Sequence, residues 1–256
     1  MKHQTGNCTI YESEVALFKD LRQTYPEDTR DRIVDDGLCW AAISKKMPDK
    51  SNRNWPECLW TESRRRVLFL LKEPNKNEGE DYKDWDWSEG SETFGNVLAY
   101  WLEGLMITRA DYCPKYMEIS SRKDIFKKYP LAIVNAKKIA GGSSANWNVI
   151  WKYAERDKSF LHRQIREILK PNIIVCGGSN DQDNYSRKFL SIALDCVFQD
   201  IKEGFRKINN WCYYNLKEEI LLIDSYHPSL IMNEQEKIES LINGFYNFIL
   251  KTDYKY

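Results

Sequence analysis

The chain has 256 residues, of which 30% are charged and 42% are apolar, and its formal net charge is zero. This composition is typical of a globular protein, and the length suits one large α/β domain or two small ones. A neutral chain has no overall attraction to nucleic acid or to a membrane surface. Any contact with phosphate must therefore come from a local basic patch.

The seven cysteines are scattered along the chain and include no Cys-x-x-Cys pair. This pattern argues against a zinc site or a disulfide framework and favours reduced thiols in the cytoplasm. The N-terminus lacks the charged-then-apolar pattern of a signal peptide, and no apolar run approaches the roughly 18 residues that span a bilayer. We therefore expect a cytoplasmic protein without membrane contact, and we expect a monomer because nothing in the sequence demands a dimer.

Residues 1–62 are predicted to form a helical extension that packs onto the rest of the chain. Apolar residues recur at helical spacing within residues 11–25, and residues 29–47 are predicted to form a second helix. A loop rich in Pro, Asn and Trp follows over residues 47–62. Residues 63–256 are predicted to form the main domain, and no clear linker separates it from the extension.

The main domain alternates between short apolar runs and helical patterns. The buried strands are expected at residues 66–71, 131–134, 173–176 and 220–223. The helices are expected at residues 93–105, 147–169, 186–198 and 233–250. A weaker apolar segment at 211–214 is expected to add a short edge hairpin. This alternation predicts an α/β fold: a three-layer α/β/α sandwich around a central, mainly four-stranded parallel sheet.

Polar side chains of three chemical types follow strands of this sheet. Glu73 follows the first strand, Asn135 ends the second, and His227 follows the fourth. Because parallel strands deliver their carboxyl ends to one edge, these side chains are expected to converge on a pocket. A carboxylate can orient water, an amide can hydrogen-bond the edge of a heterocycle, and an imidazole can stabilise an oxygen that gains negative charge. The alternatives are a solvated turn carboxylate, a strand-end cap and a turn histidine.

Four short motifs occur in order between residues 66 and 250. They are Leu71-Lys72-Glu73-Pro74-Asn75, the strand ending in Asn135, the pair Gly177-Gly178, and His227-Pro228-Ser229-Leu230. In this order the chain resembles the uracil-DNA glycosylase superfamily. The resemblance implies a monofunctional DNA glycosylase that removes uracil or another deaminated base in base excision repair. It implies single- or double-stranded DNA as the partner and needs no cofactor.

The resemblance also implies roles for the residues that match the motifs. Glu73 falls where the family places the residue that activates water, and His227 falls on the histidine that stabilises the departing base. Asn135 falls on the residue that hydrogen-bonds the pyrimidine edge, and Pro74 lies in the loop that meets the base. A glycosylase must extrude its base from the stack and hold it in a pocket, so a set of this kind suits the chemistry.

The aromatic side chain that stacks on the base should lie between the first strand and its helix. We select Phe94, with Trp87 and Trp85 as alternatives and core packing as the other interpretation. The residues expected to contact DNA are Pro228, Ser229, Leu230 and Lys138. For Lys138 and its neighbouring basic residues the alternative is a solvated surface.

The chain departs from the family pattern around Glu73. Leu71 replaces the usual glycine, Lys72 is placed to pair with Glu73, and Asn75 replaces a tyrosine or glycine. Residues 78–92 are strongly acidic, which opposes a DNA backbone. The alternative function is a catalytically weak or inactive module that binds a nucleotide, a nucleic acid or a protein partner. A hydrolase of small nucleosides is a third possibility.

The branch with the most similar motif layout holds an iron–sulfur cluster through four cysteines, one of which soon follows the asparagine. This chain reads Lys137-Lys138-Ile139-Ala140 at that place. We therefore expect no iron–sulfur cluster.

Overall fold

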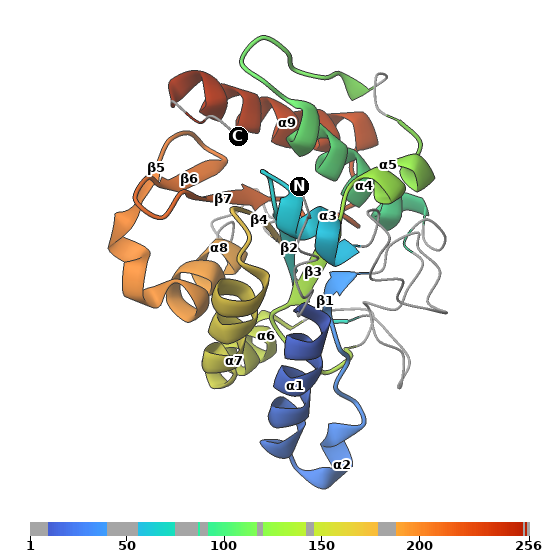
Figure 1. The fold of residues 1–256 in the computed structure, drawn as a ribbon, viewed down its shortest axis with the longest axis vertical. Coiled ribbons are helices and arrows are strands. Elements are labelled where there is room, and N and C mark those ends of the chain that lie inside the picture. The colour runs from blue at the N-terminus through green and yellow to red at the C-terminus, as the bar shows by residue number, and fades with distance from the viewer. Residues whose placement is uncertain are drawn as a thin grey trace, which may run out of the picture.

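A computed structural model describes residues 10–39, 56–74, 87, 92–116, 120–141, 146–178, 188–252 and 254 (Figure 1). Trp85, Asn75 and most of the acidic segment 78–92 lie outside the described residues, as do residues 40–55. Within the described segments, every helix is too short or too polar to cross a membrane.

A seven-stranded sheet forms the centre of the described structure, with the strand order β1-β3-β2-β4-β7-β6-β5. The strands are β1 (Gly37–Cys39), β2 (Val67–Leu71), β3 (Leu131–Asn135), β4 (Ile173–Gly177), β5 (Phe205–Lys207), β6 (Cys212–Asn215) and β7 (Ile220–Ser225). The central four, β3, β2, β4 and β7, pair in parallel. Antiparallel β1 flanks them on one side, and the hairpin β5–β6 flanks them on the other. The four parallel strands and the edge hairpin expected from the sequence are confirmed.

The helices follow most of the expected positions. They are α1 (Ile10–Gln23), α2 (Glu27–Arg30), α3 (Pro56–Glu62), α4 (Glu92–Ile107), α5 (Arg122–Lys128), α6 (Trp147–Arg156), α7 (Lys158–His162), α8 (Lys188–Ile192) and α9 (Glu234–Lys251). The long helix expected over residues 147–169 is divided at Asp157 and ends in the π-helical segment Arg163–Leu169. The Asp157 carboxylate accepts a hydrogen bond from the Tyr25 hydroxyl, so this break lies against the turn between α1 and α2.

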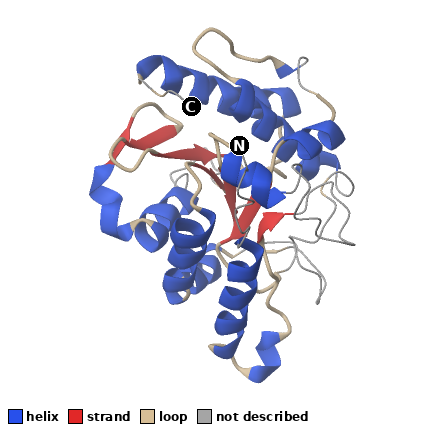
Figure 2. Ribbon diagram, in the orientation of Figure 1, coloured by secondary structure: helices blue, strands red, loops and turns tan. Residues whose placement is uncertain are grey.

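The two faces of the sheet carry separate apolar clusters because successive side chains of a strand point to opposite faces. In β2, Val67, Phe69 and Leu71 pack with residues of α4, α5 and α9. Leu68 and Leu70 pack with residues of α3, α6, α7 and α8. Figures 1 and 2 show α4 and α9 on one side of the strands and α6, α7 and α8 on the other. The fold is therefore mixed α/β, with helices packed against a mostly parallel central sheet.

The N-terminal segment differs from the expected helical extension. The helix predicted over residues 29–47 is wrong for the described part, because α2 ends at Arg30 and residues 37–39 form β1. Gly37 has a φ of +128°, which a helix does not allow and which favours glycine. Strand β1 pairs with β3 of the main domain, and Trp60 of α3 donates to the carbonyl of Leu169 at 2.7 Å. The N-terminal segment therefore shares the sheet and the core with the rest of the chain.

Candidate functional site

The carboxyl ends of the four parallel strands meet at one edge of the sheet, and β2 and β4 mark the point where the chain changes direction. From β2 the chain continues to β3 on one side, whereas from β4 it continues to β5, β6 and β7 on the other. Open α/β sheets bind ligands at such a point. A Cβ placed on Gly177 would lie 2.8 Å from Leu71 Cδ2 and 3.5 Å from Pro228 Cδ. The glycine therefore lets the ends of three strands approach one another.

His227 follows β7 at this edge and is half-buried. Its Nδ1 accepts a hydrogen bond from the backbone N–H of Ser229 at 3.2 Å, which leaves the proton of the neutral ring on Nε2. Burial, with the positive charges of Lys72 and Lys237, lowers the pKa of His227 from its ordinary value to about 3. The imidazole is therefore neutral at physiological pH, and Nε2–H is its donor.

Two aromatic side chains lie in a row beside His227. The ring of Phe94, in the first turn of α4, lies beside His227 with 6.1 Å between centroids and 47° between planes. Trp87 lies behind Phe94 at a centroid distance of 5.8 Å and is buried. Of the three aromatic candidates from the sequence, Phe94 therefore lies next to the imidazole, Trp87 is the second ring, and Trp85 is outside the described residues.

The loop after His227 is held by a lysine of α9. Lys237 is 1% exposed, and its Nζ donates to the carbonyls of Pro228 at 2.9 Å and of Leu230 at 2.5 Å. Lys237 was not among the site residues predicted from the sequence. The sequence nevertheless indicates that Lys237 is buried, because it occupies the apolar stripe of α9, one turn before the buried Leu241. Of the loop residues expected to contact DNA, Pro228 is buried, Leu230 is half-buried and Ser229 is exposed.

Glu73 is held in a buried ion pair. Its carboxylate accepts from Lys137 Nζ, and the two side chains are 8% and 9% exposed. A side chain on Gly141 would overlap the Glu73 carboxylate, and the Gly141 N–H donates to the carbonyl of Pro74 at 2.9 Å. The ion pair is therefore made by Lys137 and not by Lys72, the partner expected from the sequence. Burial lowers the pKa of Lys72, whose charge acts on both Glu73 and His227.

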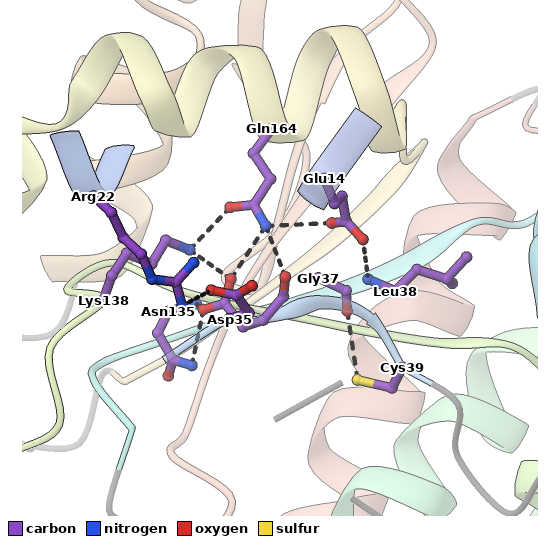
Figure 3. Close-up of polar contacts among 10 residues, drawn as sticks. Glu14, Arg22, Asp35, Gly37, Leu38, Cys39, Asn135, Lys138 and Gln164 are labelled. Atoms are coloured by element: carbon purple, nitrogen blue, oxygen red, sulfur yellow. Dashed lines mark hydrogen bonds and ion pairs between the residues drawn. The ribbon is translucent and has the colours of Figure 1, made fainter. Parts of the chain in front are cut away.

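Asn135 lies in a different environment, a buried polar cluster between β3, the N-terminal segment and the π-helical segment (Figure 3). Its backbone N–H and its Nδ2 both donate to Asp36 Oδ2, at 2.7 and 3.1 Å. Lys138 Nζ donates to Asp36 Oδ1 at 2.7 Å and to Gln164 Oε1 at 2.9 Å. Burial lowers the pKa of Lys138, and Asp36 opposes the shift.

The position of Lys138 does not fit the expected contact with DNA. Its side chain is fully buried and its ammonium group is bound inside the protein, 5.7 Å from the ring centre of Phe18 and 5.4 Å from that of Phe160. A phosphate cannot reach it in this structure. The Lys137-Lys138 pair was expected at the surface because tertiary partners cannot be seen in local sequence.

The residues at this edge therefore lie in two groups. His227, Phe94 and Lys72 form the group near β7 and β2, and Asn135 with Asp36 forms the group at β3. Among the described residues, no hydrogen bond or ion pair directly joins Glu73, Asn135 and His227. Asp36 was missed because its segment was expected to be helical.

A cleft of about 510 Å³ opens at the opposite edge of the sheet, beside the residues that precede β2, β4 and β7. Its charged lining is largely matched within the protein. Arg166 pairs with Asp200 and Glu218, and Arg66 Nε donates to the carbonyl of Lys170 at 2.7 Å. The carboxyl edge, where His227 presents a donor beside an aromatic ring, is therefore the candidate functional site.

A scan of the chain against protein-family models finds no match, and a search of curated proteins finds no significant relative. A function is therefore inferred from the residues of the site and from the order of the sequence motifs.

Proposed function

We propose that this protein is an N-glycosylase of the uracil-DNA glycosylase type, which hydrolyses the bond between DNA and uracil or another deaminated base. His227 carries the proposal, as a neutral imidazole whose Nε2–H lies at the ligand-binding edge of the sheet. A base such as uracil that leaves deoxyribose as an anion gathers negative charge on a carbonyl oxygen. A fixed N–H donor stabilises that charge in the transition state.

The neighbouring residues support the same chemistry. Water adds to C1′ of the deoxyribose, the C1′–N bond breaks, and the electron pair leaves with the base. Phe94 offers an apolar ring to the extruded base, and Lys72 adds a positive charge near the departing anion. The Glu73 carboxylate orients the water and accepts its proton. Helices on both sheet faces support the three-layer α/β/α arrangement of such an enzyme.

In this proposal the partner is DNA, in single- or double-stranded form, and the chain acts as a cytoplasmic monomer without a metal or an iron–sulfur cluster. The exposed Ser229 of the His227 loop meets a phosphate beside the extruded nucleotide. Leu230, half-buried in the same loop, lies near the vacated base stack.

One observation favours the second candidate, a module that binds a base or nucleotide without cleaving. The Glu73 carboxylate is engaged by Lys137 and covered by Gly141. A carboxylate that is paired in this way holds water less readily than a free one. In that case the site binds its ligand, and the N-glycosidic bond remains intact.

The test is release of free base from single- and double-stranded oligonucleotides that contain one uracil. We expect release by the wild type and a roughly 100-fold or larger loss in H227A, the usual effect of removing one transition-state donor. Lys152 is an exposed residue of α6, and K152M serves as the control that retains full activity. If the wild type and H227A are equally inert at micromolar enzyme, the glycosylase proposal is wrong. Binding without release, abolished by N135A, establishes the second candidate, whereas rapid turnover of free deoxyuridine indicates a nucleoside hydrolase.

A further inference from the structure

We infer that Asp36, in the N-terminal segment, is the positioning residue for the amide of Asn135 and so decides which ligand edge the site accepts. The identity of the ligand rests on the proposed function. The geometry that fixes the amide does not depend on it, and the two are tested separately below.

The side chains of Asp36 and Asn135 are in direct contact. Asp36 is fully buried, and its Oδ2 accepts from both the backbone N–H and the Nδ2 of Asn135. Two donors from one residue on one oxygen fix the torsion angles of the amide. Its Nδ2 faces Asp36, and its Oδ1 faces the other way.

The other end of the amide, Asn135 Oδ1, is left without a partner by this contact. Asn135 is 1% exposed, and its Oδ1 has no hydrogen-bond partner among the described residues. A buried carbonyl without a partner costs about 1–3 kcal/mol, so such atoms are rare in folded proteins. An unpartnered acceptor at the carboxyl end of β3, held in one orientation, is suited to receive a donor from a ligand.

The Asp36 carboxylate is itself held in place by hydrogen bonds. Its Oδ1 accepts from Lys138 Nζ at 2.7 Å and from Gln164 Nε2 at 3.1 Å. Gln164 Nε2 also contacts Glu14 Oε1, and Glu14 Oε2 accepts from the N–H of Leu38 at 3.3 Å (Figure 3). Elements α1, β1 and the π-helical segment therefore hold the carboxylate in place.

An amide fixed in one orientation selects ligands by whether they donate or accept a hydrogen bond. An amide that can rotate by 180° presents either a donor or an acceptor, whereas the amide held by Asp36 presents Oδ1 as an acceptor. A base with an imino N–H, such as uracil, matches this acceptor. Cytosine has an unprotonated ring nitrogen at that position, which cannot donate to Oδ1. A site built around a hydrogen bond rejects a ligand that cannot make it.

The test compares two substitutions of a buried carboxylate by an amide. D36N changes the group that contacts Asn135, whereas E103Q changes a buried carboxylate of α4, outside the cluster, that accepts from the N–H and the hydroxyl of Ser120. We expect D36N to lower kcat/KM for uracil release by about tenfold or more and to lower the ratio of uracil to cytosine affinity. We expect E103Q to keep the wild-type ratio. Unchanged ratios in both variants overturn the inference.

A second variant covers a failure of D36N to fold. Q164L removes one donor to Asp36 Oδ1 and leaves both charges of the Asp36–Lys138 pair in place. It should lower the uracil-to-cytosine ratio in the same direction by a smaller factor, and a wild-type ratio in Q164L then counts against the inference.

The side-chain amide of Asn135, observed by nitrogen-15 NMR, separates this inference from the proposed function. We expect slow exchange of its Nδ2 protons in the wild type and E103Q and faster exchange in D36N, or in Q164L if D36N does not fold. If the wild type neither releases nor binds uracil, the proposed function is wrong, and the exchange rates alone decide the role of Asp36. Equal exchange in all variants overturns it.

Discussion

The two ends of the candidate site are built in opposite ways. At the end of β3, Asn135, Asp36 and Lys138 are buried and bonded to one another, with one acceptor atom left over. At the end of β7, the half-buried His227 is oriented by one backbone N–H, and its loop is held by the single side chain of Lys237. The first region is stabilised by many mutual contacts, whereas the second leaves a donor and an aromatic face for a ligand. In the proposed function, recognition of the base and stabilisation of the transition state therefore belong to different strands.

The largest expected effect comes from breaking the buried network. K138M removes the ammonium group and leaves the buried Asp36 carboxylate without its charge partner. Breaking a buried pair in this way costs about 3–5 kcal/mol, and we expect a loss of that size in the free energy of unfolding from urea titration. The control K152M, at an exposed site, should change it by less than about 0.5 kcal/mol. A loss in K138M no larger than in the control contradicts the buried assignment.

A smaller effect is expected at the other region. K237M leaves the carbonyls of Pro228 and Leu230 without their donor, which costs about 1–3 kcal/mol. Because those bonds hold the His227 loop, hydrogen exchange at the N–H of Leu230 should accelerate. K251M, at the exposed end of the same helix, is the control and should leave that exchange unchanged. Wild-type protection of Leu230 in K237M would show that the loop is held by other contacts.

The pH dependence of stability sharpens the comparison. His227 takes up a proton in the unfolded chain below its ordinary pKa of about 6.5, but in the folded protein only near pH 3. Between these values the unfolded state binds more protons, so the folded state loses stability as pH falls. The contribution approaches about 1.4 kcal/mol per pH unit. Denaturation from pH 7 to 5 should therefore show a shallower decline in H227Q than in the wild type, and parallel curves would disprove the low pKa.

The smallest expected effect is at Glu73. In G141A the added methyl group overlaps the Glu73 carboxylate and displaces it from Lys137. We expect a loss of about 1 kcal/mol in the wild-type background. In an E73A background the same substitution should cost close to nothing, because the group it displaces is gone. Equal losses in both backgrounds would mean that Gly141 is required for another reason.

The parts of the fold that were predictable are those set by local pattern. Continuous apolar runs predict the four parallel strands, since a strand buried on both faces needs no polar alternation. The position of His227 at the carboxyl edge of the sheet follows from the strand that precedes it. Both predictions depend on neighbours in sequence.

The features that were not predictable depend on partners far along the chain. Lys138 was expected at the surface because lysine is rarely buried, yet Asp36 and Gln164 supply its partners from 102 and 26 residues away. Asp36 was assigned to a helix because no neighbour in sequence shows that position 37 requires glycine. The group that approaches Gly37 closely is the carboxylate of Glu14 in α1, which is distant in sequence. Long-range polar pairs of this kind leave no periodic signal in the sequence.

The most direct test of the account is the nitrogen-15 NMR spectrum of His227 during titration with uracil. We predict a neutral ring with its proton on Nε2 down to pH 5, and a shift of the Nε2–H resonance when uracil binds. The H227Q variant identifies the resonance by its absence. A ring that titrates near pH 6.5, with a resonance that uracil leaves unchanged, would contradict the assignment of His227 as the donor in a base pocket.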